Sequence, residues 1–469
     1  MDIPLVTDVD NKISKHIDQS KKTEGVFRGR AVNARTKCNS NKKKPNLLLF
    51  SCNFGSGHKM ASQGIKECLP DYNVKIVDIY DGPLRSFNIF EHLSPSLSNE
   101  NIVNYLANKQ FNRFISFMGN IGAKIFNLSR NRNENSIKEY LLKNKPDLLV
   151  SCIPLVNSIL NNVAKELNIP LLVVTTDIDL TNFCKGFEDK DITVDKRKLQ
   201  ITVPYSAQNW KYKFGKEYSE KLEKSFHYSF GFPTRKAFTE KIDEQSLDLI
   251  RKEYGITSDE NVILIIMGGN SSQAAEDYAK LLLEMTDTEI KKIIGNDNHR
   301  NKIHLVCLCG DTKNEENQKL LETLNKFNES YEKKNNLVRI HGCPSTNKVA
   351  ELVSLPELCT VISKPGGSTV NEMIKKKIPM IYHVSETLLD WEKGNMEYGE
   401  SRDFGMQFQT SGEINPTQKS KFAKVLNHTM ELHKKMKTDP EYVPEAENDF
   451  SENLRATVKE MLKSNSSKN

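Results

Sequence analysis

The chain has 469 residues, 37% of them hydrophobic and 27% charged, and a formal net charge of +6. This length exceeds one ordinary hydrophobic core and predicts two domains or more. No run of 18 consecutive apolar residues occurs and the N-terminus lacks the basic-then-apolar order of a signal peptide. The sequence therefore predicts a soluble or peripheral protein without a membrane-spanning helix.

The positive charge is concentrated at the N-terminus. Residues 1–44 hold 11 Lys and Arg against 5 Asp and Glu, which leaves 56 residues of each sign in the rest of the chain. We expect this extension to be disordered, because it has few large apolar residues and no hydrophobic period. The Lys and Arg residues of this extension either belong to a solvated tail or contact anionic lipid headgroups. The formally neutral body argues against nucleic-acid binding.

The nine cysteines contain no Cys-x-x-Cys pair. An odd number in a chain of this length favours free thiols in a reducing, cytoplasmic compartment over a disulfide framework or a structural zinc site.

Apolar runs alternate with helical patterns in the first half of the chain, which predicts a parallel sheet covered by helices on both faces. The runs are 46–52, 74–79, 147–152, 171–176 and 199–203, and the helical patterns are 60–69, 100–130 and 158–167.

The first run leads into a glycine loop, Gly55-Ser56-Gly57-His58. The loop lacks the third glycine of a dinucleotide fingerprint and the spacer of a phosphate-binding Walker loop. It presents one imidazole at the end of a strand, where histidine can act as a general base. An ordinary surface or capping histidine is the alternative.

A second series of runs follows the linker Phe230-Gly231-Phe232-Pro233, at 261–267, 304–309, 337–341, 360–362 and 379–383. The first three are followed by glycine, at Gly268 and Gly269, Gly310 and Gly342. Ligands of open parallel sheets bind outside the carboxyl ends of the strands, where small residues leave room. We therefore expect an α/β fold of two Rossmann-like domains facing across a cleft.

The fourth run of this series leads into Ser363-Lys364-Pro365-Gly366-Gly367-Ser368-Thr369-Val370-Asn371-Glu372. The glycine pair permits close approach of a ligand, and Ser368 and Thr369 suit a helix start. The free N–H groups and the dipole at such a start attract phosphate, and Glu372 is placed to reach sugar hydroxyls. A plain strand-to-helix turn with a capping hydroxyl is the alternative.

These patterns predict a basic extension at 1–44, an acceptor-side domain at 45–232 and a nucleotide-binding domain at 233–410. They also predict C-terminal helices at 411–462 and a disordered tail at 463–469.

The two glycine motifs together resemble those of the processive diacylglycerol and monogalactosyldiacylglycerol glycosyltransferases, and more distantly the enzyme that adds N-acetylglucosamine to lipid I. Further landmarks of that family follow in the same order over residues 45–410: Val173-Val174-Thr175-Thr176-Asp177, Gly231-Phe232-Pro233, Met267-Gly268-Gly269, Cys309-Gly310 and Glu392-x-Gly394-Asn395.

This resemblance implies the GT-B fold and an inverting transfer from a UDP-sugar, without a cofactor or a protein-bound metal. It implies that His58, with Asp177, deprotonates the acceptor. The implied donor site comprises Gly57, Gly268, Gly269, Gly310, Cys343, Lys364, Gly366, Gly367, Ser368, Thr369, Glu372, Glu392 and Asn395. Within it, backbone near Cys343 meets the uracil, the glycines and hydroxyls approach the phosphates, Glu372 binds the ribose, and Glu392 with Asn395 holds the hexose.

The sequence departs from the family pattern at two places. Trp391 precedes Glu392 where the family has Gln, and the segment after Asp177 lacks the usual His and Trp. Asp177-x-Asp179 also mimics the metal-binding motif of the other glycosyltransferase fold, and we interpret Asp179 as incidental. The hexose and the acceptor therefore stay open.

Residues 105–130 are rich in Phe and basic side chains. They form either an interfacial helix with Arg113 at the headgroups or a helix packed on its own sheet. The main hypothesis is a UDP-hexose-dependent transferase acting on a lipid acceptor at an anionic membrane surface. The alternatives are a sugar-nucleotide epimerase of the same fold and a UDP-sugar-binding protein with impaired catalysis.

Overall fold

The computed structural model describes residues 44–52, 56–85, 129–187, 195–205, 220–268, 273–294, 302–331, 337–385, 388–439 and 449–466. All of them belong to one compact unit that begins at Lys44. The basic extension up to residue 43, almost all of the aromatic stretch 105–130, and Gly269 lie outside the described residues.

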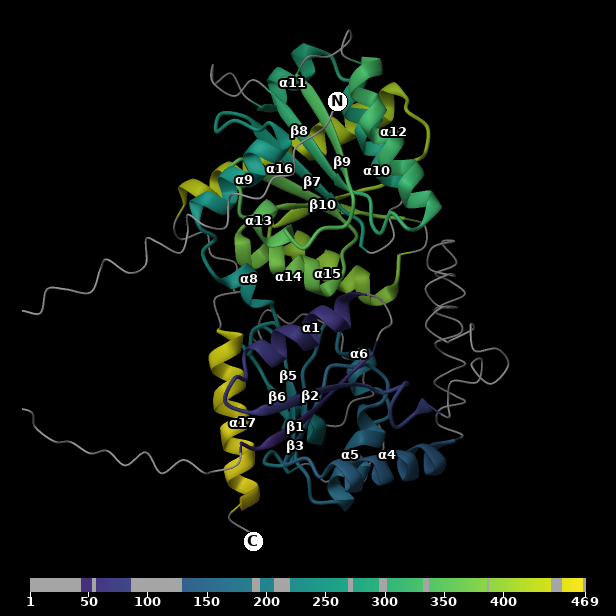
Figure 1. Cartoon of the computed structure of the whole chain (residues 1–469), viewed down its shortest axis with the longest axis vertical. Helices are drawn as coiled ribbons and strands as arrows, with labels where there is room; N and C mark the ends of the chain where they lie inside the picture. The colour runs from purple at the N-terminus through teal and green to yellow at the C-terminus, as the bar shows by residue number, and fades with distance from the viewer. Residues whose placement is uncertain are drawn as a thin grey trace, which may run out of the picture. The chain divides into compact units, whose positions relative to one another are not determined.

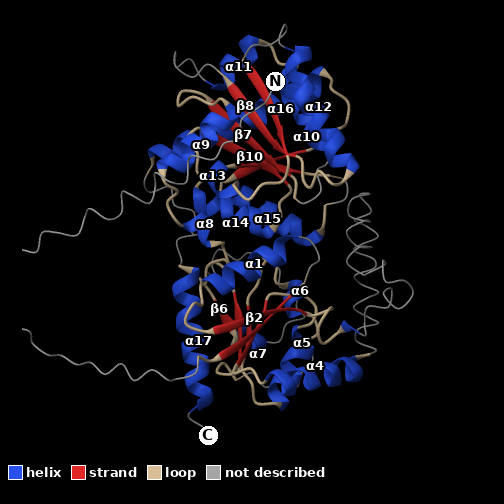
Figure 2. Ribbon diagram, viewed as in Figure 1, coloured by secondary structure: helices blue, strands red, loops and turns tan. Residues whose placement is uncertain are grey.

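The first half of this unit is built on a six-stranded parallel sheet with the strand order β2-β1-β3-β4-β5-β6 (Figures 1 and 2). Its strands are β1 (Asn46–Ser51), β2 (Asn73–Asp78), β3 (Leu148–Ser151), β4 (Leu171–Val173), β5 (Leu199–Thr202) and β6 (Phe226–His227). The helices in this part of the chain are α1 (Ser56–Glu67), α4 (Arg130–Asn144), α5 (Asn157–Glu166), α6 (Thr181–Cys184) and α7 (Glu220–Glu223).

The second half holds another six-stranded parallel sheet, with the order β12-β11-β10-β7-β8-β9. Its strands are β7 (Asn261–Ile266), β8 (Ile303–Leu308), β9 (Val338–Cys343), β10 (Leu358–Ser363), β11 (Met380–His383) and β12 (Gly405–Phe408). Its helices are α8 (Lys236–Thr239), α9 (Glu244–Tyr254), α10 (Gln273–Leu283), α11 (Asp287–Ile294), α12 (Glu315–Tyr331), α13 (Val349–Val353), α14 (Gly367–Lys376), α15 (Asp390–Ser401) and α16 (Pro416–Thr438).

Both faces of the first sheet are buried, which explains why its strands are continuous apolar runs. Along β1, Leu47 and Leu49 point into one hydrophobic cluster, whereas Leu48 and Phe50 point into another. The two sheets therefore confirm the predicted pair of Rossmann-like units.

The C-terminal helix α17 (Phe450–Ser466) returns to the first sheet (Figure 1). Its apolar face, which includes Phe450 and Leu454, belongs to the same cluster as Leu47 and Leu49. The expected disordered tail from residue 463 is wrong up to Ser466, because α17, which packs here through residues that include Met461, continues to Ser466.

The apolar pattern missed two strands, β6 and β12. β6 has only two residues, and the two central residues of β12 are exposed at the edge of the sheet. Such short edge strands are determined by pairing with a neighbour and leave no apolar run in the sequence.

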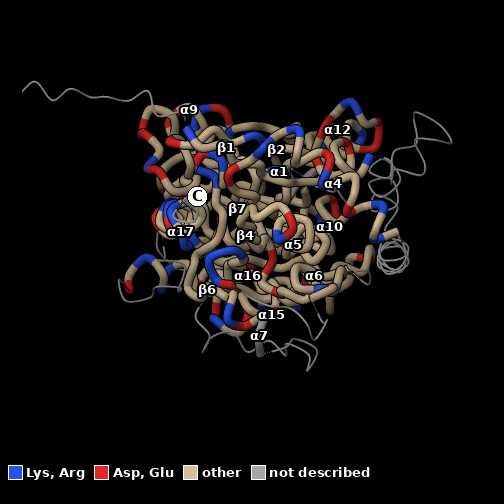
Figure 3. Tube along the Cα trace, turned by 90° about the horizontal axis from the view of Figure 1, so that it is seen from below, with Lys and Arg blue, Asp and Glu red and all other residues tan. Residues whose placement is uncertain are grey.

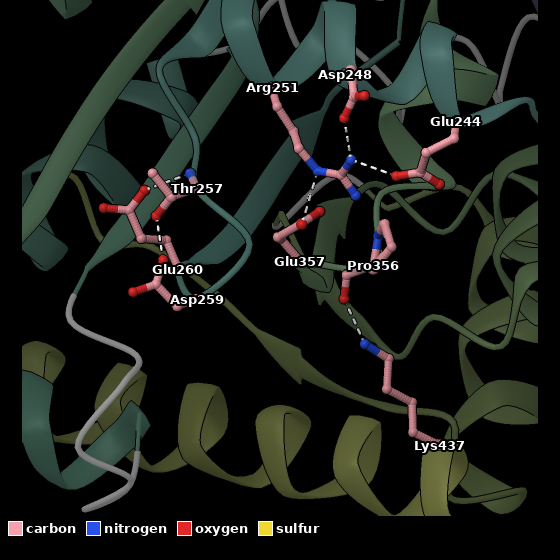
Figure 4. Close-up of polar contacts among 9 residues, drawn as sticks. All are labelled: Glu244, Asp248, Arg251, Thr257, Asp259, Glu260, Pro356, Glu357 and Lys437. Carbon is pink, nitrogen blue, oxygen red and sulfur yellow. Dashed lines mark hydrogen bonds and ion pairs between the residues drawn. The ribbon is translucent and has the colours of Figure 1, made fainter.

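Polar contacts tie helices to the second sheet, among them a cluster at the amino end of β10 (Figure 4). Arg251 on α9 donates to Glu244, Asp248 and the buried Glu357 at the start of β10, over 2.6–2.9 Å. Nearby, Lys437 on α16 donates to the Pro356 carbonyl. These contacts tie α9 and α16 to the amino end of β10.

Charges of both signs are interspersed along the described part of the chain (Figure 3), as the formally neutral body predicts. No helix in the described ranges combines the length and the apolar character that crossing a membrane requires.

Candidate active site

The two glycine motifs occupy equivalent places in the two sheets. β1 lies between β2 and β3, and β10 lies between β7 and β11, so in each sheet the strand order reverses beside the motif. The loops that follow the strands at such a reversal leave a crevice in which open parallel sheets bind ligands. Helix α1 follows β1 and helix α14 follows β10. Each of these helices therefore begins where the strand order of its sheet reverses.

The starts of these two helices touch each other. The Ser368 hydroxyl on α14 donates to the Gly57 carbonyl on α1 at 3.3 Å. A Cβ atom on Gly367 would lie 2.2 Å from the Thr176 carbonyl oxygen and 2.8 Å from Asp177 Oδ1. The structure therefore brings the predicted phosphate motif and the predicted acceptor-side residues into direct contact.

The start of α14 differs from the sequence prediction in one respect. The helix begins at Gly367 with Gly366 as its N-cap, and no side chain caps it. Ser368 instead reaches across to Gly57. The first N–H groups of α14 therefore keep the capacity to bind an anion, and open space lies beside Gly366, with no atom within 4 Å of a Cβ built there.

His58 lies in the first turn of α1, and not in a loop as the sequence suggested. Its Nδ1 is 3.1 Å from the Cys152 carbonyl oxygen and 3.2 Å from Thr176 Oγ1. Because a carbonyl oxygen only accepts, this network assigns the proton to Nδ1 and leaves the lone pair on Nε2. Burial lowers the pKa of His58 to about 4, against the opposing effect of the hydrogen bond to Cys152. The imidazole is therefore neutral at pH 7.

Asp177 lies next to this network but is not hydrogen-bonded to His58 in the described structure; Thr176 is the side chain that contacts the imidazole. Burial raises the pKa of Asp177 to about 7, the hydrogen bond from Asn395 opposes this rise, and Glu392 and Asp179 add to it. Asp179 itself accepts from the backbone N–H and the hydroxyl of Thr181, at the start of α6.

Asn395 on α15 joins the two halves of the unit. Its side chain is fully buried, its Oδ1 accepts from the Ile178 N–H at 3.0 Å, and its Nδ2 donates to the Pro365 carbonyl at 3.0 Å and to Asp177 Oδ1 at 3.3 Å. The amide thus links the segment after β4 to the loop before α14. In this structure it is engaged by the protein, and its predicted contact with the hexose stays a prediction.

Glu392 also has a local partner, because its Oε2 accepts from the Leu389 N–H at 3.2 Å at the start of α15. Burial raises the pKa of Glu392, while this hydrogen bond and the positive charge of Lys364 oppose the rise. Lys364 also lowers the pKa of His383, which burial brings to about 4. The charge of the half-buried Lys364, in the loop before α14, thus acts on both residues.

Glu372 is buried and forms a two-point ion pair with Arg235. The Arg235 Nε donates to Glu372 Oε1 at 2.8 Å, and a terminal nitrogen donates to Oε2 at 3.0 Å. Burial raises the pKa of Glu372, and Arg235 opposes that rise. No sequence pattern predicted a role for Arg235; its only signal was its position just after the Gly231-Phe232-Pro233 linker.

Three further predicted donor-site residues, Gly268, Gly310 and Cys343, lie at the carboxyl ends of strands of the second sheet. Gly268 follows β7 with a φ of +88° and open space beside it, and Gly310 follows β8 with a φ of +82°. Cys343 ends β9, where it is buried and its carbonyl accepts from the Cys309 N–H at 2.7 Å. These positions agree with a ligand crevice, and a contact with uracil stays a prediction.

A second set of contacts between the two halves was not foreseen. The Tyr205 hydroxyl, beyond β5, donates to Asn371 Oδ1 on α14, and the Tyr205 ring stacks on Tyr398 of α15 at 4.2 Å. Asn371 in turn donates to the Gly367 carbonyl at 2.8 Å. The turn that opens α14 is thus held by the first half of the unit. No sequence signal predicts which tyrosine makes such a contact.

Comparison with solved structures defines the class of fold. The crystal structure of MurG from Acinetobacter baumannii aligns with 89% of this chain and 100% of that chain, with a TM-score of 0.51 and 13% identity. The crystal structure of TcCGT1 in complex with UDP aligns with 90% of this chain and 100% of that chain, with a TM-score of 0.50 and 14% identity. The chain has the GT-B fold.

The curated proteins that resemble the chain are lipid glycosyltransferases. A processive diacylglycerol beta-glucosyltransferase of Staphylococcus epidermidis is 25% identical over 372 residues, 78% of this chain and 82% of the relative. The Bacillus cereus protein of the same description is 20% identical over 385 residues, 79% and 84% of the two chains. No family model matches the chain. The resemblance to this family of enzymes is confirmed over most of the chain, and with the fold it supports glycosyltransferase function.

Proposed function

We propose that this chain is an inverting glycosyltransferase that moves a hexose from a UDP-sugar to the hydroxyl of a lipid acceptor of diacylglycerol or glycolipid type. The observation that carries the proposal is the contact between the two helix starts. A neutral histidine with its lone pair on Nε2 lies in the first turn of α1, and the uncapped start of α14 adjoins that turn. A base for the acceptor and an anion site for the donor thus meet at one place.

His58 is neutral at pH 7 and has a free lone pair on Nε2, and a general base requires both. In the proposed step, Nε2 takes the proton of the acceptor hydroxyl while the hydroxyl oxygen attacks the anomeric carbon of the sugar. The bond from that carbon to the diphosphate oxygen breaks on the opposite face, and the configuration inverts. The Cys152 carbonyl holds the Nδ1 proton and fixes the orientation of the ring. Asp177, when ionised, favours the imidazolium that forms.

The leaving UDP gains negative charge, and we propose that protein groups stabilise it. The first N–H groups and the dipole of α14 suit this task, and Lys364 lies in the loop just before them. Independence from a metal ion is part of this proposal. Full activity in the presence of EDTA would support it, and a loss that Mg²⁺ or Mn²⁺ reverses would contradict it.

We further propose a peripheral position on an anionic, cytoplasmic membrane surface. The support is the lipid named for the curated relatives, together with the basic and aromatic texture of residues 105–130. Co-sedimentation of the full chain with vesicles containing anionic lipid, against vesicles of neutral lipid alone, tests this position.

The deciding experiment measures transfer of radiolabel from a panel of UDP-hexoses to diacylglycerol and to extracted lipids. Label in the organic phase is the expected result. Conversion of the donor to an epimeric sugar nucleotide, without lipid product, would favour the epimerase. Binding of UDP without any product would favour a binding protein with impaired catalysis.

A further inference from the structure

Arg235 has an unusual position in the fold. It lies in the connection between the two sheets, immediately before α8, and its side chain reaches the buried acid of α14. The exposed fraction is 27% for the Arg235 side chain and 8% for that of Glu372. An ion pair this deeply placed is screened far less by water than a surface pair.

Both ends of Arg235 are held by neighbouring elements. Its guanidinium carbon lies 4.4 Å from the ring centroid of the buried Phe238, a distance suited to a cation–π contact. On the backbone side, the Lys236 N–H donates to Glu67 of α1 at 3.0 Å, and Thr234 packs against Gly64 of α1. The guanidinium is therefore presented to Glu372 in one fixed orientation.

This geometry leaves Glu372 able to accept further hydrogen bonds. Arg235 supplies one N–H to each carboxylate oxygen, and each oxygen of a carboxylate has a second lone pair. The two parallel bonds fix the plane of the carboxylate, and the positive charge favours its ionised form against the effect of burial. An ionised carboxylate held in one plane is a good acceptor for two adjacent hydroxyl groups.

We propose that Arg235 is a positioning residue of the donor site, which orients Glu372 to accept from the ribose hydroxyls of the nucleotide. The inference deepens the proposed function and rests on it. Glu372 lies on the helix whose start is the candidate phosphate site, so phosphates and ribose of one nucleotide can be held by one helix. The competing explanation is that the ion pair only braces the connection to α14.

Calorimetric binding of UDP and of 2′-deoxy-UDP separates the two explanations. The two ligands differ by one ribose hydroxyl, so a brace affects both equally. For the unaltered chain we expect UDP to bind about tenfold or more tightly than 2′-deoxy-UDP, the effect of one hydrogen bond to a charged group. Arg235→Ala should weaken UDP binding by a similar factor and reduce the preference for UDP to about twofold or less.

Three single variants and one double variant serve as controls. Glu372→Gln should lose the same preference, and adding Arg235→Ala to it should change the preference no further, because the two residues act as one unit. Lys236→Ala is the matched control, since the Lys236 ammonium pairs with the exposed Glu240 and not with Glu372. It should keep the full preference. Arg235→Lys keeps the charge without the planar fork and should keep an intermediate preference.

The outcomes distinguish this inference from the proposed function. Equal weakening of both ligands by Arg235→Ala, with the preference retained, would show a brace and overturn the inference. UDP binding by the unaltered chain without any preference over 2′-deoxy-UDP would also overturn it. Absence of UDP binding by the folded, unaltered chain would contradict the proposed function itself. If Arg235→Ala does not fold, the same ratio of UDP affinity to 2′-deoxy-UDP affinity is compared between Arg235→Lys and Lys236→Ala. A lower ratio in Arg235→Lys supports the inference, and an equal ratio overturns it.

Discussion

His58 and Asp177 show how burial sets the charge of the candidate site at the level of single residues. Burial disfavours the charged form of any group, so it lowers the pKa of the histidine to about 4 and raises that of the carboxylic acid to about 7. Near pH 6 both groups are therefore mostly neutral. A site that must accept an anionic donor gains from carrying little negative charge before the donor binds.

These two pKa values make the pH dependence of activity diagnostic. If neutral His58 is the only titrating requirement, kcat/KM of the free enzyme should stay level down to about pH 5 and fall towards pH 4. A requirement for ionised Asp177 would instead place the fall near pH 7. A pH–rate profile of the Asp177→Asn variant decides, since a fall near pH 7 caused by Asp177 disappears in that variant.

His58→Ala should lower kcat by about a hundredfold or more, which is the usual effect of losing a general base. The measurement is the initial rate of label transfer at saturating donor. His428→Ala on α16 is the control and should retain the rate. A loss within about threefold for His58→Ala would contradict the role of His58 as the base.

Asp177 also gives a prediction for stability. Between pH 3.8 and about 7 the unfolded chain releases the Asp177 proton while the folded chain keeps it, so the free energy of unfolding falls as the pH rises through this window. Asn does not titrate and can still accept from Asn395. Asp177→Asn should therefore stabilise the protein by up to about 4 kcal/mol at pH 8 and by little at pH 4. Thermal unfolding at the two pH values measures this, and an equal effect at both would contradict it.

At the scale of elements, the start of α14 is where the two halves of the unit are fitted together. Its first residues contact the segment after β4, Asn371 anchors it to Tyr205, and Asn395 of α15 ties the loop before it to Ile178. The helix start that the sequence predicts as a phosphate site therefore also makes polar contacts between the halves. If the proposed donor site is correct, donor binding and the arrangement of the halves depend on the same residues.

Adjacent glycines in this turn provide a matched test. A Cβ on Gly367 would overlap the Thr176 carbonyl, whereas a Cβ on Gly366 meets no atom within 4 Å. Gly367→Ala should therefore destabilise the fold by about 1–3 kcal/mol, as overpacking does, and Gly366→Ala should have little effect. Chemical denaturation of both variants measures the difference. Equal stability of the two would show that the contact at Gly367 does not persist in solution.

The sequence predicted most elements of the sheets because they are buried on both faces. A continuous apolar run such as that of β1 is visible without any knowledge of its neighbours. The helix starts were less predictable. Gly57 and His58 lie in the first turn of α1, and α14 starts at Gly367. The partners at these turns lie far away in the sequence: Ser368 contacts Gly57, and Cys152 and Thr176 contact His58. Residues such as Tyr205 and Arg235 carry no pattern for the same reason.

At the scale of the whole described molecule, α17 completes the core of the first sheet from the far end of the chain. Leu454 on this helix is fully buried beside residues of β1 and β3. The first sheet therefore depends on residues more than 200 positions beyond its last strand. The last of the C-terminal helices, which the sequence predicts as a segment separate from both domains, belongs physically to the first half.

Leu454→Ala tests this dependence. Removal of a fully buried leucine should cost about 2–5 kcal/mol, and hydrogen exchange should show faster local opening in β1 and β3 than in β7 and β8. Lys459→Ala, on the exposed side of the same helix, should change stability by less than about 0.5 kcal/mol. Uniform loss of protection in both sheets would instead show that the two halves unfold as one cooperative unit.

The sequence by itself determined two parallel sheets, their chain order, and two glycine motifs at strand ends, because strand burial and glycine-rich turns leave local patterns. Only the tertiary structure decided what those motifs face. The order of the strands places each motif at a reversal of its sheet. Burial gives His58 its neutral state and Asp177 its raised pKa, and a contact across the unit gives Glu372 its partner Arg235. These properties arise from desolvation and pairing between residues far apart in the chain, which no local pattern records.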